Sequence, residues 1–312
     1  MNRDCVVIIG SGLMGGGIAA VSALAGNKTI LVDMNLKKAE TGIDNAIKNI
    51  DELVENGIAD KDAAGRAKEL LTLSEDMEES LVRAKMVIEA IYENLQAKQE
   101  LFEKLDMLLP TDIPILSNTS GLRITDIASR VKNPGRTVTA HFWFPAHLVP
   151  LVEVVMGDQT DETVAVSVKD TLAKWGKAPV LVRKDLPGQL ANRILQAVIR
   201  EAVNIVAMGL ASPEDVDTAV KMGMGIRFPA WGPLEHIDAV GLDLAVAVQN
   251  NVLPAISSST VSNCYLTELV NRGDLGYKTG KGIYDWSQKD MDQLARGRNE
   301  FIIYALKKIG KK

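Results

Sequence analysis

The stretch Cys5–Gly15, CVVIIGSGLMG, decides the fold that this sequence predicts. Its apolar start is long enough for a strand buried on both faces, and its end, residues 10–15, fits the pattern G-x-G-x-x-G. A helical pattern over residues 18–24 and a second strand over residues 29–32 follow, and Asp33 closes the unit. The glycine pattern alone is a weak signal, but strand, helix, strand and acid around it are typical of a dinucleotide-binding unit.

Each residue of the glycine motif has an expected role in binding a cofactor. Gly10 permits a tight turn, Gly12 lets a pyrophosphate approach the backbone, and Gly15 lets the helix pack closely on the strand. Leu13 and Met14 begin the helix, whose N-terminal N–H groups and partial positive charge favour phosphate. The alternative is a glycine-rich turn of an α/β fold that binds no ligand.

Asp33 indicates which dinucleotide is bound. It lies 18 residues after Gly15, at the end of the second strand. A carboxylate there can accept hydrogen bonds from the ribose hydroxyls of NAD, and it would repel the 2′-phosphate of NADP. The expected cofactor is therefore NAD.

The composition limits the classes of function. With 312 residues the chain is long enough for two domains, and a net charge of −5 argues against a general binder of nucleic acid or of anionic membranes. No apolar run approaches the roughly 20 residues that a membrane helix needs, and the first residues do not resemble a signal peptide. We expect a cytoplasmic protein whose partner is a small-molecule substrate.

The order of patterns predicts an α/β fold with two domains. Residues 1–185 read as a Rossmann-type doubly wound sheet, with an inserted helical hairpin that starts at Asn35 and whose second helix runs from about Asp60 to Leu71. Residues 186–312 read as an all-helical domain for substrate binding and dimerisation, because helical patterns dominate there. The remaining expected strands are 86–91, 113–116, 137–142, 151–155 and 180–182.

His141 and Glu153 are the candidate catalytic pair. His141 ends one predicted strand, where open α/β sheets place their ligands, and Glu153 lies twelve residues on in the neighbouring strand. A buried carboxylate beside an imidazole fixes its tautomer and stabilises its protonated form, as an alcohol dehydrogenase without metal requires. An isolated histidine and a strand glutamate are more often ordinary structural residues, but the nucleotide-binding unit favours catalysis. No cluster of ligands indicates a metal.

The whole chain resembles the L-3-hydroxyacyl-CoA dehydrogenases. Seven blocks carry the resemblance, in order along the chain: GSGLMGGGIA (10–19), VIEAIYENLQAKQELF (87–102), SNTSGLRITDIA (117–128), HFWFP with VPLVEVV (141–155), LPGQLANRILQAVIREA (186–202), MGMG with GPLEHIDAVGLD (222–243) and GYKTGKGIYDW (276–286). The resemblance implies that His141 is the acid/base and that Glu153 is its carboxylate partner. It also implies a homodimer.

The resemblance assigns further residues to the site. Ser120 and Asn192 match residues that hydrogen-bond the 3-oxygen of the substrate or hold the pocket, although a helix-capping role is the plain reading of each. Glu93 and Lys98 match positions at the nicotinamide end of the cofactor, and Asn118 sits beside them.

Three departures from the family pattern concern the substrate. The family block H-F-F-N-P has Phe144 in place of its asparagine, and the hairpin segment 50–62, IDELVENGIADKD, is acidic where lysines are common, although Lys48 and Lys61 remain. The longer loop 222–238 contains Arg227, which suits a carboxylate through two parallel hydrogen bonds. The plain reading of Arg227 is a solvated loop charge.

These observations predict the NAD-dependent oxidation of a short L-3-hydroxyacyl-CoA, such as 3-hydroxybutyryl-CoA, to the 3-oxo form. The alternative enzyme is a dehydrogenase of a small 3-hydroxy acid that carries no CoA. A third hypothesis, from another class, is a protein that binds NAD without catalysis as a sensor or a structural component.

Overall fold

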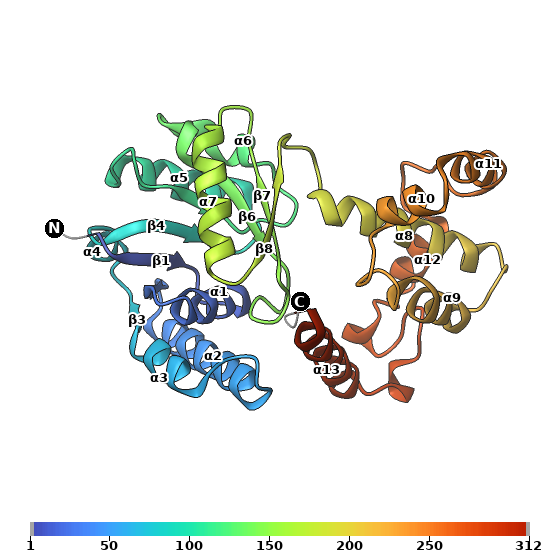
Figure 1. Ribbon diagram of the computed structural model, residues 1–312, viewed down its shortest axis with the longest axis horizontal. Coiled ribbons are helices and arrows are strands. Elements are labelled where there is room, and N and C mark those ends of the chain that lie inside the picture. The colour runs from blue at the N-terminus through green and yellow to red at the C-terminus, as the bar shows by residue number, and fades with distance from the viewer. Residues whose placement is uncertain (1–2, 310–312) are drawn as a thin grey trace. The chain divides into compact units, whose positions relative to one another are not determined.

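The computed structural model describes residues 3–309. One eight-stranded sheet has the order β3-β2-β1-β4-β5-β6-β7-β8 (Figure 1). Neighbouring strands from β3 to β6 are parallel, β7 runs antiparallel to β6, and β8 is parallel to β7. The strands are β1 (Cys5–Ile9), β2 (Lys28–Val32), β3 (Leu71–Ser74), β4 (Ala84–Glu89), β5 (Ile115–Ser117), β6 (Thr137–Phe142), β7 (Leu151–Val155) and β8 (Ala178–Val182).

The helices fall into two groups along the chain (Figure 1). Those interspersed with the strands are α1 (Leu13–Leu24), α2 (Leu36–Glu55), α3 (Lys61–Glu69), α4 (Met77–Leu81), α5 (Leu95–Leu108), α6 (Ile124–Ile127) and α7 (Glu162–Lys174). Those after the sheet are α8 (Leu190–Ala207), α9 (Pro213–Ala219), α10 (Pro233–Val240), α11 (Leu242–Val252), α12 (Cys264–Asn271) and α13 (Met291–Ile309), with a π-helical turn at Val220–Gly225.

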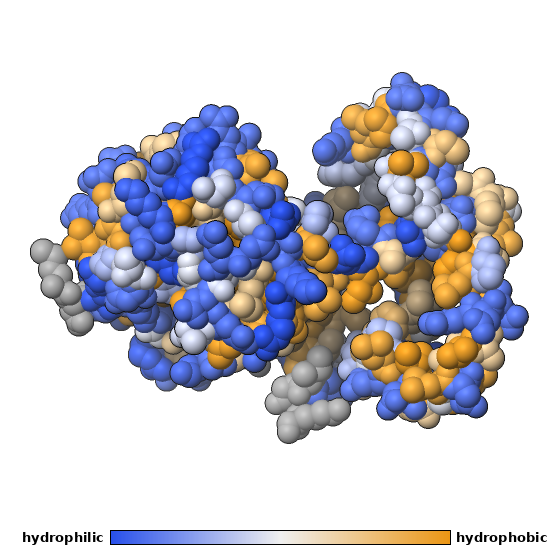
Figure 2. Space-filling model, turned by 90° about the horizontal axis from the view of Figure 1, so that it is seen from above, coloured by the Kyte–Doolittle hydropathy of each residue, from blue (hydrophilic) through white to orange (hydrophobic). Residues whose placement is uncertain are grey.

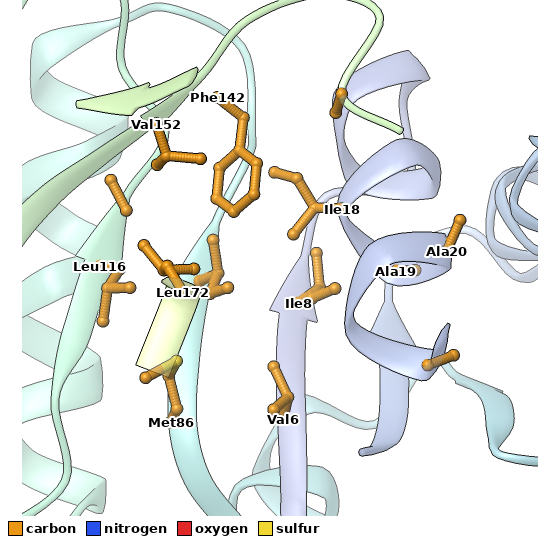
Figure 3. Packing of buried hydrophobic residues seen from close by; sticks show 14 of the residues in the cluster. Val6, Ile8, Ile18, Ala19, Ala20, Met86, Leu116, Phe142, Val152 and Leu172 are labelled. Carbon is orange, nitrogen blue, oxygen red and sulfur yellow. The ribbon is translucent and has the colours of Figure 1, made fainter. Parts of the chain in front are cut away.

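Apolar side chains of the central strands alternate between two covered faces. Val6 and Ile8 point into one cluster with α1, α2, α3 and α7, whereas Val7 and Ile9 point into another with α4, α5 and α6. Figure 3 shows the first cluster, in which Phe142 of β6 lies near Ile18 of α1. A period of two puts successive side chains on opposite faces, and a strand with apolar residues throughout therefore lies between two layers of helices.

The predicted fold class is confirmed: a doubly wound sheet with an inserted hairpin, α2 and α3, precedes a helical region. The expected strands 86–91 and 113–116 are each shifted by one or two residues, to Ala84–Glu89 and Ile115–Ser117. One expected helix end was wrong in kind. The second helix of the hairpin was expected to reach Leu71, but it ends at Glu69, and Leu71–Ser74 pairs with β2 as an edge strand. The four residues LTLS are too short to show a period, and their pairing with β2 decides their conformation.

Two compact units divide the chain, with a boundary between Leu190 and Ala191. The end of α13, from Ile302, groups with the first unit, because Ile302 and Ile303 pack with Leu53 of the hairpin and Leu148. These limits differ from the predicted domains 1–185 and 186–312. The division into a cofactor domain and a substrate domain stays a prediction.

Spanning a membrane requires a helix that is both long and apolar. None of the helices within residues 3–309 combines the length and the apolar composition needed to cross a bilayer.

Substitution of Gly15 tests the packing of α1 on the sheet. A Cβ at Gly15 would lie 1.8 Å from the carbonyl oxygen of Gly10. We expect Gly15→Ala to lower the free energy of unfolding by about 1–3 kcal/mol, as overpacked sites do, and to weaken NADH binding. Gly65→Ala in α3 is the control, because a Cβ there meets no atom of the described structure within 4 Å. Gly65→Ala should raise the free energy of unfolding by about 0.5–1 kcal/mol. Equal effects in urea denaturation would contradict the packing argument.

Candidate active site

The glycine-rich turn between β1 and α1 has the geometry that its sequence predicted. Gly10 has φ of +105°, and a Cβ there would lie 2.5 Å from the carbonyl oxygen of Ala90. A Cβ on Gly12 would instead meet no described atom within 4 Å, and no described side chain caps the N-terminus of α1. The turn therefore leaves space and backbone N–H groups next to Gly12, which suits a phosphate.

Asp33 lies beside this turn, at the end of β2. Its Oδ2 accepts hydrogen bonds from the amide (3.2 Å) and the hydroxyl (2.7 Å) of Ser11, and its Oδ1 accepts one from the amide of Asn35 at 3.3 Å. Burial raises the pKa of Asp33, but these hydrogen bonds outweigh that effect and the pKa is lowered overall. A carboxylate that stays ionised is a good acceptor for hydroxyl groups.

The sheet order places the turn where open α/β sheets bind ligands. Strand order reverses between β1 and β4, and the turn follows the carboxyl end of β1. Open space at Gly12, free helical N–H groups and an ionised acid at the end of β2 fit a dinucleotide.

His141 and Glu153 face each other across β6 and β7. They are paired in the antiparallel register, and His141 Nδ1 lies 2.7 Å from Glu153 Oε2. The side chains are 6% and 0% exposed, respectively. Because Glu153 holds Nδ1–H, the neutral ring has its acceptor nitrogen at Nε2.

Trp143 is a further partner of the pair. Its indole Nε1–H donates to the same Glu153 Oε2 at 2.9 Å, and its ring centroid is 5.7 Å from that of His141. The structure thus adds a donor that the sequence analysis did not single out.

A second polar cluster lies after β4 and β5. Lys98 of α5 is 1% exposed and bonds the carboxylate of Glu89 at 2.5 Å, while Glu93 lies 3.4 Å from the same ammonium group. Glu93 also accepts from the hydroxyl of Thr119 (2.5 Å) and the amide of Ser120 (3.2 Å). Burial raises the pKa of Glu93, but the Thr119 hydrogen bond and the charge of Lys98 outweigh burial and lower it.

Asn118 connects this cluster to β6. Its side-chain oxygen accepts a hydrogen bond from the amide of Phe142 at 2.8 Å, and its own amide donates to the carbonyl oxygen of Glu89 at 2.8 Å. The residue after His141 is thereby fixed to the turn that follows β5.

The predicted site residues thus fall into two sets. The first compact unit contains the glycine motif, Asp33, Glu93, Lys98, Asn118, Ser120, His141 and Glu153. The second contains Asn192, in the first turn of α8, and Arg227, in the exposed loop before α10. Arg227 Nη2 lies 3.3 Å from His236 Nδ1, and the His236 ring makes an edge contact with Trp231 at 5.1 Å between centroids.

Glu89 and Trp143 were missed by sequence reasoning. Glu89 is fully buried at the end of β4, where its carboxylate accepts from Lys98 and from the hydroxyl of Ser117 at 2.6 Å. A glutamate in the apolar run MVIEAI was the available signal, because buried carboxylates are almost always paired. Nothing in the sequence distinguished Trp143 from an ordinary apolar residue.

Lys177 fixes the turn that joins β6 to β7. Its Nζ donates to the carbonyl oxygens of Ala146 (2.5 Å) and Val149 (3.0 Å), and burial lowers its pKa to about 8. His147, in the same turn, hydrogen-bonds Glu52 of α2 at 2.8 Å. Burial lowers the pKa of His147, although Glu52 opposes that shift.

The fold and these residues define a Rossmann-type nucleotide-dependent dehydrogenase. Residues 5–186 match the NAD binding domain of 3-hydroxyacyl-CoA dehydrogenase, and residues 188–286 match the C-terminal domain of the same family. The chain belongs to the 3-hydroxyacyl-CoA dehydrogenase family. It is an NAD-dependent oxidoreductase, and the hypothesis of a non-catalytic NAD-binding protein was wrong.

Relatives in the family differ in the substrates that they are named for. A probable 3-hydroxybutyryl-CoA dehydrogenase of Bacillus subtilis is 36% identical over 285 residues, which cover 91% of this chain and 98% of the relative. A 5-formyl-3-hydroxy-2-methylpyridine 4-carboxylate 5-dehydrogenase of Mesorhizobium japonicum is 30% identical over 301 residues, 96% of each chain.

Solved structures show the same range. A crystal structure of a 5-formyl-3-hydroxy-2-methylpyridine 4-carboxylic acid 5-dehydrogenase has a TM-score of 0.89 at 30% identity, and it covers 99% of this chain and 98% of its own. The (S)-3-hydroxybutyryl-CoA dehydrogenase of Ralstonia eutropha has a TM-score of 0.76 at 31% identity, and it covers 92% of this chain and 100% of its own.

The lowered pKa of Lys177 predicts a pH dependence of stability. Between pH 8 and 10.5 the unfolded chain keeps a proton on this amine that the folded chain has lost, so the free energy of unfolding rises with pH. The free energy of unfolding should therefore be measured in urea for the wild type and for Lys177→Met. We expect the value of the wild type minus that of the variant to increase by about 2–3 kcal/mol from pH 8 to 10.5. A difference that is flat with pH would mean that the buried amine has its ordinary affinity for protons.

Proposed function

We propose that this protein oxidises the hydroxyl group of an L-3-hydroxyacyl substrate, with His141 as the base and Glu153 as its partner. The hydrogen bond of 2.7 Å between these buried side chains carries the proposal. A neutral imidazole held at Nδ1 by a carboxylate accepts a proton at Nε2, and the carboxylate stabilises the cation that results. In the direction of ketone reduction the same atom returns the proton.

NAD, when bound, would supply the hydride acceptor, and His141 takes the hydroxyl proton. We infer that Asp33 accepts hydrogen bonds from the ribose and that the turn over Gly10, Gly12, Leu13, Met14 and Gly15 holds the pyrophosphate. Their support is the lowered pKa of Asp33 and the open space at Gly12.

Glu93, Lys98 and Asn118 are proposed to line the nicotinamide end. The position of these residues supports this assignment, because they follow the carboxyl ends of β4 and β5, beside the point where strand order reverses. Lys98 and Glu89 form a buried pair that keeps this edge of the sheet fixed.

A short acyl group on CoA is the proposed substrate. Relatives named as 3-hydroxybutyryl-CoA dehydrogenases support it, since they match the chain over most of its length. Ser120 and Asn192 are the residues proposed to hydrogen-bond the substrate oxygen.

A small acid without CoA is the second candidate, and the charge of the hairpin tip favours it. Residues 51–62 contain five acidic residues and one lysine, and Lys68 behind them is bonded to Asp51 at 2.6 Å. An acidic surface repels the phosphates of CoA. The Mesorhizobium relative is named for a pyridine carboxylate, and Arg227 is the residue proposed to bind a free carboxylate.

The exposed apolar surface of the second compact unit supports the proposal of a homodimer. Among its described residues 191–301, only Val203 and Leu269 are buried. Large apolar side chains are instead exposed, and Figure 2 shows hydrophobic patches on the face in view. Seven such residues are each at least 47% exposed: Leu210, Leu234, Leu242, Leu244, Val246, Val248 and Val252. A unit without a buried core of its own requires a partner surface, and a second copy of the chain supplies one.

Sedimentation tests the homodimer. We expect a species of twice the chain mass in sedimentation equilibrium at micromolar concentration. Val246→Arg, which puts a charge on the exposed apolar surface of α11, should shift the equilibrium toward the monomer because a buried charge is costly. Lys221→Glu, a charged substitution at a residue that is already polar and exposed, serves as the control. A monomeric wild type would contradict the proposal.

The His141→Asn variant tests the proposed base. Turnover should fall by about 10²–10⁴-fold, the usual contribution of a general base, while the Kd for NADH measured by fluorescence should stay unchanged. His147→Asn is the control, since His147 bonds Glu52 and not Glu153. Turnover that survives in the His141 variant would remove this residue from the role.

A comparison of two oxo substrates tests the acyl carrier. NADH-linked reduction should be more efficient with acetoacetyl-CoA than with acetoacetate if the thioester is the substrate. The double variant Lys48→Ala/Lys61→Ala should then raise the KM for the thioester alone, because it removes cations from an already acidic hairpin.

Lys104→Ala, on α5, is the control for a general loss of positive charge. Efficient turnover of the free acid with failure on the thioester would select the second candidate.

A further inference from the structure

Trp143 contacts the carboxylate of the His141–Glu153 pair, and the proposed reaction does not use Trp143. Its indole Nε1–H donates a hydrogen bond to Oε2 of Glu153 at 2.9 Å. The same oxygen accepts from His141 Nδ1 at 2.7 Å, so two donors converge on it.

When one carboxylate oxygen accepts two hydrogen bonds, each of the two bonds is weaker than it would be alone. A carboxylate oxygen that already accepts a neutral N–H has less negative charge available for a second donor, and hydrogen bonds to the ionised form favour that form. The indole N–H does not titrate, so it supports the ionised Glu153 at every working pH. The attraction between Glu153 and a protonated His141 is correspondingly weaker.

The bond also fixes the carboxylate in space. Glu153 comes from β7 and Trp143 follows the end of β6, so the hydrogen bond ties the carboxylate to the segment that carries His141. Trp143 is half-buried, and its ring is tilted by 54° relative to the imidazole. Oε2 is thus held toward Nδ1 by a second, independent contact.

We propose that Trp143 is a positioning residue for the His141–Glu153 pair, which orients the carboxylate and weakens its hold on the protonated imidazole. The proposal rests on the proposed function, in which His141 is the base. Its consequence is that His141 stays neutral, and able to accept a proton, at a lower pH than it would with phenylalanine at this position.

The charged groups of the neighbouring elements are known. Glu153 of β7 contacts the imidazole directly. Glu89 at the end of β4, Glu93 after it and Lys98 of α5 form a separate ion-paired cluster, and Asn118 connects the turn after β5 to the backbone amide of Phe142. A substitution at Trp143 leaves these groups in place, so a change in titration can be assigned to the lost donor.

The Trp143→Phe variant removes the donor and keeps an aromatic ring. The acidic limb of kcat/KM for alcohol oxidation should move up by about 0.5–1 pH unit, as the loss of one hydrogen bond to the carboxylate implies. We also expect kcat to fall several-fold, with an unchanged Kd for NADH. Trp175→Phe is the matched control, because Trp175 ends α7 and packs against the apolar core.

A titration without substrate separates this proposal from the proposed function. NMR of the imidazole signals, with His141 assigned by its loss in His141→Asn, should show the same upward shift in Trp143→Phe. An unchanged midpoint overturns the proposal. A shifted midpoint with an unshifted limb of kcat/KM supports the hydrogen-bond effect and overturns the role of His141 as the base.

An isosteric replacement guards against a folding defect. Benzothienylalanine at position 143 keeps the shape of the indole and has sulfur in place of the N–H group. The replacement should reproduce the shifts seen with phenylalanine, because only the donor is lost. Wild-type titration in the isostere would assign the effect to packing and overturn the proposal.

Discussion

The close contact between α1 and β1 is the constraint on which the rest of the first unit depends. At Gly15 the helix approaches the carbonyl oxygen of Gly10 so closely that no side chain fits between them. This contact fixes the start of α1 at the edge where strand order reverses. The turn that results holds Ser11, whose amide and hydroxyl bind Asp33. A single packing requirement thus sets the dinucleotide site and the position of the acid beside it.

The candidate site residues collect at one edge of the sheet because the carboxyl ends of parallel strands meet there. Glu89 ends β4, Asn118 follows β5, and His141 lies near the end of β6. The reversal of β7 then brings Glu153 to His141 from the opposite direction, through a turn fixed by Lys177. A carboxylate supplied by the next strand in sequence can be placed opposite the imidazole by register alone.

Exposed segments are less constrained by the core than the buried His141–Glu153 pair is. Phe144 is 51% exposed after β6, and the acidic residues of segment 51–62 lie at the end of α2, in the loop after it and in the first turn of α3. Such positions can change without disturbing buried strands. Relatives in this family are named for thioesters and for a pyridine carboxylate, so one fold serves different substrates.

The sequence alone determined the fold class, the cofactor and the proposed identity of the catalytic pair. These follow from the spacing of glycines, the apolar run of β1, the acid after β2 and the resemblance of seven sequence blocks to one family. Only the tertiary structure decided that Leu71–Ser74 is a strand, that Glu89 pairs with Lys98, and that Trp143 shares an oxygen of Glu153 with His141. Each of these features is a contact between segments that are distant in the sequence. Residue spacing along the chain does not determine which side chains of two such segments face each other.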